Sequence, residues 1–140
     1  MGGPTTGGSQ VELTGTTLQV ATELASDERK HVVDLRNLIA SQGVEQIAKP
    51  AINLDALMTG FGSQNEFLFL SRIFEDIGVT AYAGAAPLLT NATNIGYAAR
   101  ILAVEALHAG NIRLEIAQAG IVTTPPLDSV DILPPPSGKY

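Results

Sequence analysis

The sequence has 140 residues and a mass of 14.6 kDa, which is the size of a single domain. Hydrophobic residues make up 45% of it, enough for a core of ordinary size, and 14 acidic residues outnumber 8 basic ones. This acidic balance provides no basic stripe to neutralise phosphates, so we expect no nucleic-acid partner. The absence of cysteine excludes disulfides, thiol catalysis and cysteine-ligated metal sites.

The sequence gives no sign of membrane insertion or export. No apolar run approaches the roughly 18 residues of a membrane span. Residues 1–9 lack the basic and apolar regions of a signal peptide. We therefore expect a soluble protein without membrane insertion, and the compartment stays open, including export if a signal precedes these residues.

Both ends of the sequence differ in composition from its middle. Residues 1–15 are rich in glycine and threonine and predict a flexible N-terminal segment. Residues 121–140 contain two proline runs and predict an irregular, proline-rich tail. The helical domain is therefore expected over residues 1–120.

A first helix is predicted from about Thr17 to Ser41. Thr16 and Gln19 have the spacing of a capping box, and Gly43 is a suitable C-terminal stop. Its apolar residues recur at helical spacing along one face: Leu18, Ala21, Leu24, Val32, Leu35 and Leu38. Two polar residues interrupt this face, Glu28 and His31.

Residues 42–62 predict a long crossover, with a short helix over Asn53–Met58. A second helix should begin at Ser63, which forms a capping box with Glu66, and end before Pro87. Apolar residues occur on nearly all of its sides, which is typical of a mostly buried helix.

A third helix is predicted from about Ala92 to Ala119, capped by Thr90 or Asn91 and stopped at Gly120. Its core face follows spacings of three and four: Ile95, Ala98, Leu102, Glu105, Ala109, Ile112 and Ile116. The fold class is therefore all-α, an antiparallel bundle of three long helices. The crossover is too long for a simple turn and predicts that the first and second helices run parallel.

Both histidines follow a glutamate by three residues, in Glu28–His31 and Glu105–His108. This spacing puts the two side chains of each pair on one helix face. Each pair interrupts an apolar face, where a buried carboxylate is costly unless its charge is compensated. A divalent metal ion compensates it, and carboxylate with neutral imidazole suits iron or manganese.

A third carboxylate, Glu75, lies in the middle of the most apolar helix. Carboxylate-bridged dinuclear bundles use the ligand order Glu, Glu-x-x-His, Glu, Glu-x-x-His. The sequence contains the last five of these ligands in that order, and a helix for the first glutamate is missing. We therefore predict a dinuclear iron or manganese site, incomplete in this chain, with the ligands Glu28, His31, Glu75, Glu105 and His108.

Three motifs resemble the desiccation-related ferritin-like proteins: residues 74–89, residues 101–113, and Asp27–His31 followed by Leu35-Arg36. The resemblance covers about residues 1–118. Members of that family begin with one more helix, which ends just before a Gly-Gly-Pro segment similar to residues 2–8. The resemblance implies a ferritin-like bundle whose fourth helix is missing here or supplied by a partner.

Two function classes follow. The first is a dinuclear metalloprotein in oxidative or desiccation stress protection or in iron handling, working as a homo-oligomer or with a separate chain carrying the missing helix. The second is a non-catalytic ferritin-like scaffold or assembly protein with a degenerate metal site. In that case glutamates and histidines satisfy one another, with Arg100 or Arg113. No catalytic residue or reaction is identified, so enzymatic activity stays an open question.

Overall fold

The computed structural model describes residues 2–57 and 60–121. In this part of the chain the three long helices are α1 (Gly15–Ser41), α2 (Gln64–Ala85) and α3 (Ala92–Gln118). The shorter elements are the strands β1 (Thr5–Thr6) and β2 (Ile52–Asn53) and the 3₁₀ turns η1 (Leu54–Leu57) and η2 (Ala86–Leu88). The predicted all-α class is confirmed, and the predicted proline-rich tail lies almost wholly outside the described residues. None of the described helices combines the length and the apolar character needed to cross a membrane.

The chain divides into two compact units, the first ending at Phe67 and the second beginning at Leu68. The first unit contains β1, α1, β2, η1 and the start of α2. The second contains the rest of α2, then η2 and α3.

In the first unit, α1 begins at Gly15, slightly earlier than predicted. The N-cap residue is Thr14, and its side chain makes no cap hydrogen bond. Thr16 lies inside the helix, so the capping box predicted from Thr16 and Gln19 was wrong. Instead, the Thr14 N–H donates to Gln64 Oε1 over 2.9 Å, a contact between residues 50 positions apart that local sequence spacing does not reveal. The predicted stop is confirmed, because Gly43 has φ +69° and its N–H donates to Ala40 O over 3.0 Å.

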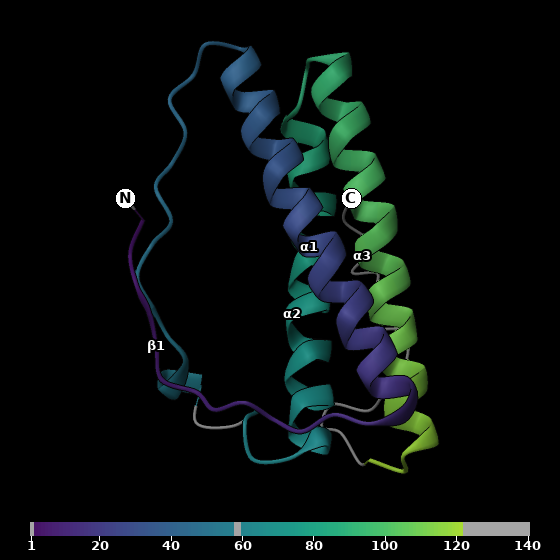
Figure 1. The fold of residues 1–140 in the computed structure, drawn as a ribbon. Coiled ribbons are helices and arrows are strands. Elements are labelled where there is room, and N and C mark those ends of the chain that lie inside the picture. The colour runs from purple at the N-terminus through teal and green to yellow at the C-terminus, as the bar shows by residue number, and fades with distance from the viewer. Residues whose placement is uncertain (1, 58–59, 122–140) are drawn as a thin grey trace. The chain divides into compact units, whose positions relative to one another are not determined.

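The N-terminal segment lies along the crossover (Figure 1), where the sequence predicted a flexible segment. β1 and β2 pair in parallel, with Thr5 opposite Ile52. Lys49 Nζ donates to Gly3 O over 3.0 Å and to Thr5 Oγ1 over 2.6 Å. Asp55, in η1, accepts a hydrogen bond of 2.9 Å from the backbone N–H of Gly8. Side chains of the crossover thus hold the backbone of the N-terminal segment.

The α2 helix begins at Gln64, one residue after the predicted start, and its end before Pro87 is confirmed. The Glu66 N–H donates to Ser63 Oγ over 3.2 Å, which is half of the predicted capping box. The Glu66 carboxylate accepts from the Gly62 N–H over 2.9 Å, one residue before the expected partner. The side chains of Ser63 and Glu66 therefore both accept backbone hydrogen bonds at the start of α2.

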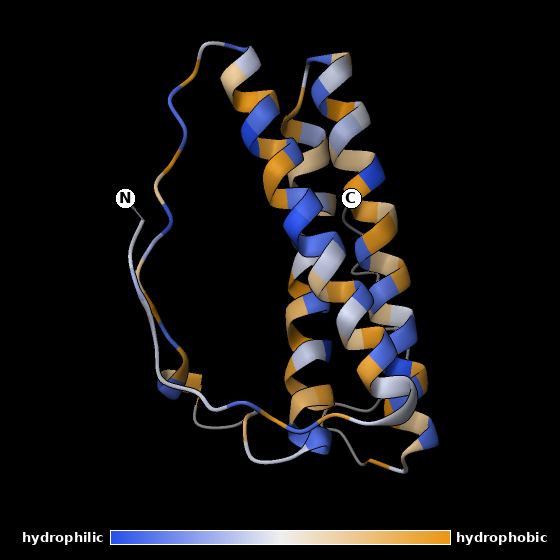
Figure 2. Cartoon of the chain, viewed as in Figure 1, coloured by the Kyte–Doolittle hydropathy of each residue, from blue (hydrophilic) through white to orange (hydrophobic). Residues whose placement is uncertain are grey.

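The hydrophobic residues of α2 are divided between a buried and an exposed side. Most buried positions follow spacings of four and three, as Leu68, Arg72, Glu75 and Val79. Elsewhere on the helix, large apolar side chains are exposed: Ile73 (37%), Phe74 (48%) and Ile77 (55%). The prediction of a mostly buried helix was therefore wrong for the described part of the chain. Figure 2 shows hydrophobic residues over much of α2, and the pattern alone could not tell which of them are covered.

The α3 helix starts as predicted, because Asn91 Oδ1 accepts hydrogen bonds from the backbone N–H groups of Thr93 (2.9 Å) and Asn94 (3.2 Å). Through η2 the chain reverses, and α3 runs antiparallel beside α2 (Figure 1). The buried residues of α3 form one continuous seam: Ile101, Glu105, His108, Ala109, Ile112 and Ile116. Carboxylate and imidazole groups thus stand among the apolar residues of this helix.

Candidate metal centre

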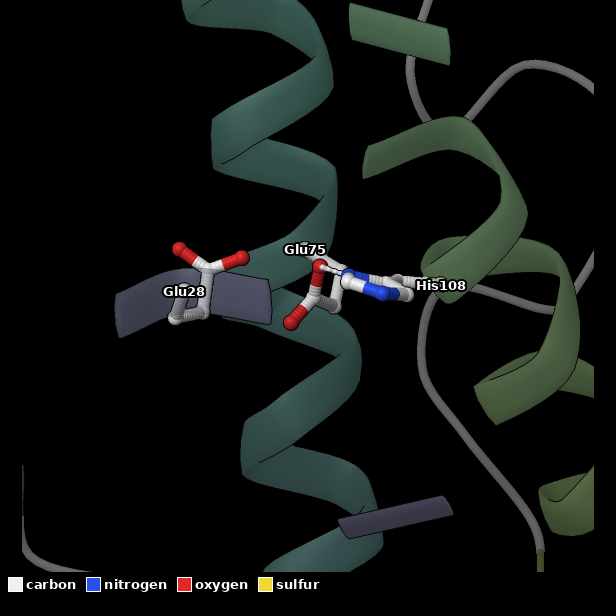
Figure 3. A group of neighbouring side chains, drawn as sticks. All are labelled: Glu28, Glu75 and His108. Atoms are coloured by element: carbon white, nitrogen blue, oxygen red, sulfur yellow. Dashed lines mark ion pairs between the residues drawn. The ribbon is translucent and has the colours of Figure 1, made fainter. Parts of the chain in front are cut away.

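Two of the predicted ligands meet directly in the second unit. Glu75 on α2 and His108 on α3 are 6% and 3% exposed, so both are buried. The His108 Nδ1 and Glu75 Oε2 atoms lie 3.3 Å apart, and Figure 3 shows the carboxylate turned toward the imidazole ring. The two side chains come from neighbouring antiparallel helices, so the packing of α2 on α3 creates this pair.

The separation of these two atoms suits a shared metal ion. Two donors bound about 2.1 Å from one first-row metal ion lie roughly 3.0 Å apart at octahedral angles and roughly 3.4 Å apart at tetrahedral angles. The observed 3.3 Å falls within this range. Carboxylate and imidazole are also the donor types that iron and manganese accept. The geometry and chemistry of this pair therefore fit a divalent metal.

Glu105 lies one turn before His108 on the buried seam of α3 and is 5% exposed. Its carboxylate lies against α2 at Gly78, so closely that a Cβ atom on this glycine would overlap Glu105 Oε2. Gly78 is three residues after Glu75 and lies on nearly the same face of α2. The α2–α3 pair therefore brings Glu75, Glu105 and His108 to one stretch of its interface.

The other two predicted ligands, Glu28 and His31, are on α1 in the first unit. The atoms His31 Nδ1 and Glu28 Oε1 lie 3.2 Å apart. The spacing of three residues on a helix predicted this close approach. The His31 side chain is 11% exposed, whereas that of Glu28 is 47% exposed. His31 shares the buried face of α1 with Thr17 and Leu24 at intervals of seven residues. This pair offers the same donor types as Glu75 and His108, at a separation of 3.2 Å compared with 3.3 Å.

Burial of these groups has an energetic consequence. Glu75 and Glu105 are nearly inaccessible to water. Glu105 stands among apolar residues on the buried face of α3, whereas the buried face of α2 that carries Glu75 also carries Arg72. A carboxylate transferred from water to such a place loses several kcal/mol of solvation unless a cation or donor compensates it. A bound divalent cation would supply that compensation for both groups.

A second polar cluster, which the sequence analysis missed, lies beside the first. Arg113 on α3 forms two contacts with Asp76 on α2: Nη1 lies 2.6 Å from Oδ1, and Nη2 donates to Oδ2 over 2.8 Å. The buried Arg72 places its Nε 3.8 Å from Asp76 Oδ2. The spacing of four residues between Arg72 and Asp76 was the available sequence signal. Arg113, which the sequence suggested as a partner for the site glutamates, makes both of these contacts with the neighbouring Asp76.

In a comparison with protein families, residues 5–118 match a ferritin-like domain. No curated protein and no solved structure matches the chain. The matched region runs from β1 to the last residue of α3 and contains all five candidate ligands. Because the match covers far more than half of the 140 residues, the chain belongs to the family of ferritin-like domains.

Proposed function

We propose that this protein binds two iron or manganese ions in a carboxylate-bridged site. The proposed ligands are Glu28, His31, Glu75, Glu105 and His108. The observation that carries the proposal is the buried Glu75–His108 pair, whose donor atoms lie 3.3 Å apart across two helices of a ferritin-like domain. Carboxylates and imidazoles in these positions are groups that could hold a metal ion.

The residues have different roles in this proposal. We assign bridging or chelating roles to Glu28 and Glu105, and terminal roles to the two histidines. Glu75 is a bridging or terminal carboxylate. When bound, an iron or manganese pair supplies one-electron chemistry toward oxygen or peroxide.

The protein's own side chains prepare the second unit for this role. The apolar seam of α3 excludes water from Glu105 and His108, and burial strengthens their interaction with a cation. The Arg113–Asp76 contact fixes α2 against α3 close to the Glu75–His108 pair. Rigid helices that support ligands in this way favour a preorganised metal site.

We also propose that a further helix completes the bundle and adds one more carboxylate. The exposed Ile73, Phe74 and Ile77 support this, because contiguous apolar surface of this kind usually marks an interface. A second copy of the chain or another polypeptide segment would supply that helix. The desiccation-related motifs at residues 74–89 and 101–113 support a role in oxidative or desiccation stress or in iron handling.

One alternative has a specific observation in its favour. A protonated His108 and an ionised Glu75 at 3.3 Å can form an ion pair without any metal. The protein would then be a non-catalytic ferritin-like scaffold in which a former metal site has become a structural polar network.

Metal titration separates these two functions. Metal-free protein titrated with Fe(II) under anaerobic conditions, or with Mn(II), should bind two equivalents per site, and His108→Ala should lose at least one of them. His108 is the suitable choice because it is buried and contributes a donor atom to the Glu75 pair. If wild-type protein binds neither metal above the level of His108→Ala, the scaffold function is correct instead.

A further inference from the structure

The contact between Glu105 and α2 depends on a glycine in the middle of that helix. A Cβ atom built on Gly78 would overlap Glu105 Oε2 and lie 2.9 Å from Glu105 Cδ. Real Cβ atoms do not approach neighbouring atoms so closely, so any other residue at this position would require Glu105 to move. Glu105 is 5% exposed, and its carboxylate is therefore enclosed rather than free to swing into water.

Glycine is an unfavourable residue for this position on local grounds. In a helix interior it is less stable than alanine, because its backbone loses more conformational freedom on folding. Gly78 lies well inside α2 (Gln64–Ala85) and is not among the glycines with positive φ, so backbone conformation does not explain it. What does explain it is the space that its missing side chain leaves for the Glu105 carboxylate.

Other helical glycines of the protein lack such a neighbour. Gly110, in the interior of α3, and Gly84, near the end of α2, would meet nothing within 4 Å if they carried a Cβ atom. The close approach at Gly78 is thus specific to the helix face that carries Glu75, three residues earlier. It is not a general property of glycine in these helices.

We propose that Gly78 is a positioning residue, a notch in α2 that seats the Glu105 carboxylate beside Glu75 and His108. Its role in metal binding rests on the proposed function, whereas the seating of Glu105 does not. A larger residue at position 78 would push the carboxylate away from α2 and change the donor arrangement, although position 78 itself supplies no ligand atom. Displacing a group that orients metal ligands typically weakens metal binding about 10–100-fold.

The first test uses metal-free protein and a double-mutant cycle. Gly110→Ala should raise the melting temperature by a few degrees, as expected for a helix-interior glycine with open space around it. Gly78→Ala should lower the melting temperature, because the new methyl group collides with Glu105. In the Glu105→Ala background the collision is gone, and Gly78→Ala should then raise the melting temperature as Gly110→Ala does. If Gly78→Ala has the same effect in both backgrounds, the notch does not exist.

The second test measures Mn(II) affinity in competition with a chelator. Gly78→Ala should bind the metal about 10–100-fold more weakly than wild type, and Gly110→Ala should bind it equally well. Unchanged affinity in Gly78→Ala, with metal bound by wild type, would overturn the positioning role. If wild type itself binds no metal, the proposed function fails, and the metal-free cycle still decides whether Gly78 seats Glu105.

Discussion

Glu105→Ala is expected to abolish transition-metal binding. Glu105 is buried on α3 and is proposed to bridge or chelate the two ions, so its loss removes a donor that no neighbouring water can easily replace. The free energy of unfolding of the metal-free protein should stay the same or increase, because a buried carboxylate has been removed. Inductively coupled plasma mass spectrometry of the purified, metal-loaded variant, together with urea denaturation of the metal-free form, measures both effects.

The matched control is Glu23→Ala. Glu23 is an exposed residue of α1 outside the proposed ligand set, so this variant should keep the metal content of wild type. Equal metal content in wild type, Glu105→Ala and Glu23→Ala would show that Glu105 is not a ligand. Equal loss in both variants would show that metal binds through general surface charge.

Asp76→Ala should reduce the free energy of unfolding by about 3 kcal/mol. Removing one member of a buried charge pair leaves the other charge without compensation, which typically costs 3–5 kcal/mol, and the partial exposure of this pair lowers the figure. The Asp76 side chain is 16% exposed and that of Arg113 is 18% exposed. The variant removes both contacts to Arg113 and the approach of Arg72. Chemical denaturation of the metal-free protein measures the change.

Asp34→Ala is a suitable control for this measurement. Asp34 lies on α1 and is exposed, so its replacement should change the free energy of unfolding by less than about 0.5 kcal/mol. A similarly small change for Asp76→Ala would mean that the Arg113 contact contributes nothing to holding α2 against α3. The helices would then be held by their apolar seam alone.

The helices could be predicted well because their signals are local. Apolar residues at spacings of three and four, together with Asn91 at one end of α3 and Gly43 beyond α1, identify helices and their ends without reference to the rest of the chain. The start of α1 was missed because Thr14 is bound by Gln64, a residue far away in sequence. A capping motif cannot report such a contact.

The candidate site shows the same division between local and tertiary information. The spacing of Glu28 and His31 predicted their close approach, because three residues along a helix bring two side chains together. The pairing of Glu75 with His108 required the register between α2 and α3, which no local pattern gives. The role of Gly78 was hidden for the same reason, since a glycine in a helical pattern does not reveal which side chain occupies its space.

The exposed side of α2 also illustrates a limit of sequence patterns. Apolar residues on all sides of a helix predict burial on all sides. Ile73, Phe74 and Ile77 are nevertheless exposed. A hydrophobic pattern indicates that a surface favours an apolar partner, but it does not show whether that partner belongs to the same chain. The same pattern is therefore consistent with the proposed further helix from a second copy or another polypeptide.

The most direct test of the proposed metal centre is a crystal structure of the manganese- or iron-loaded protein with diffraction data collected at the absorption edge of the metal. We expect anomalous difference peaks at the side chains of the five proposed ligands, including a peak in contact with both Glu75 and His108. Anomalous peaks confined to exposed surface carboxylates, with no peak at Glu75 and His108, would contradict the proposed metal centre.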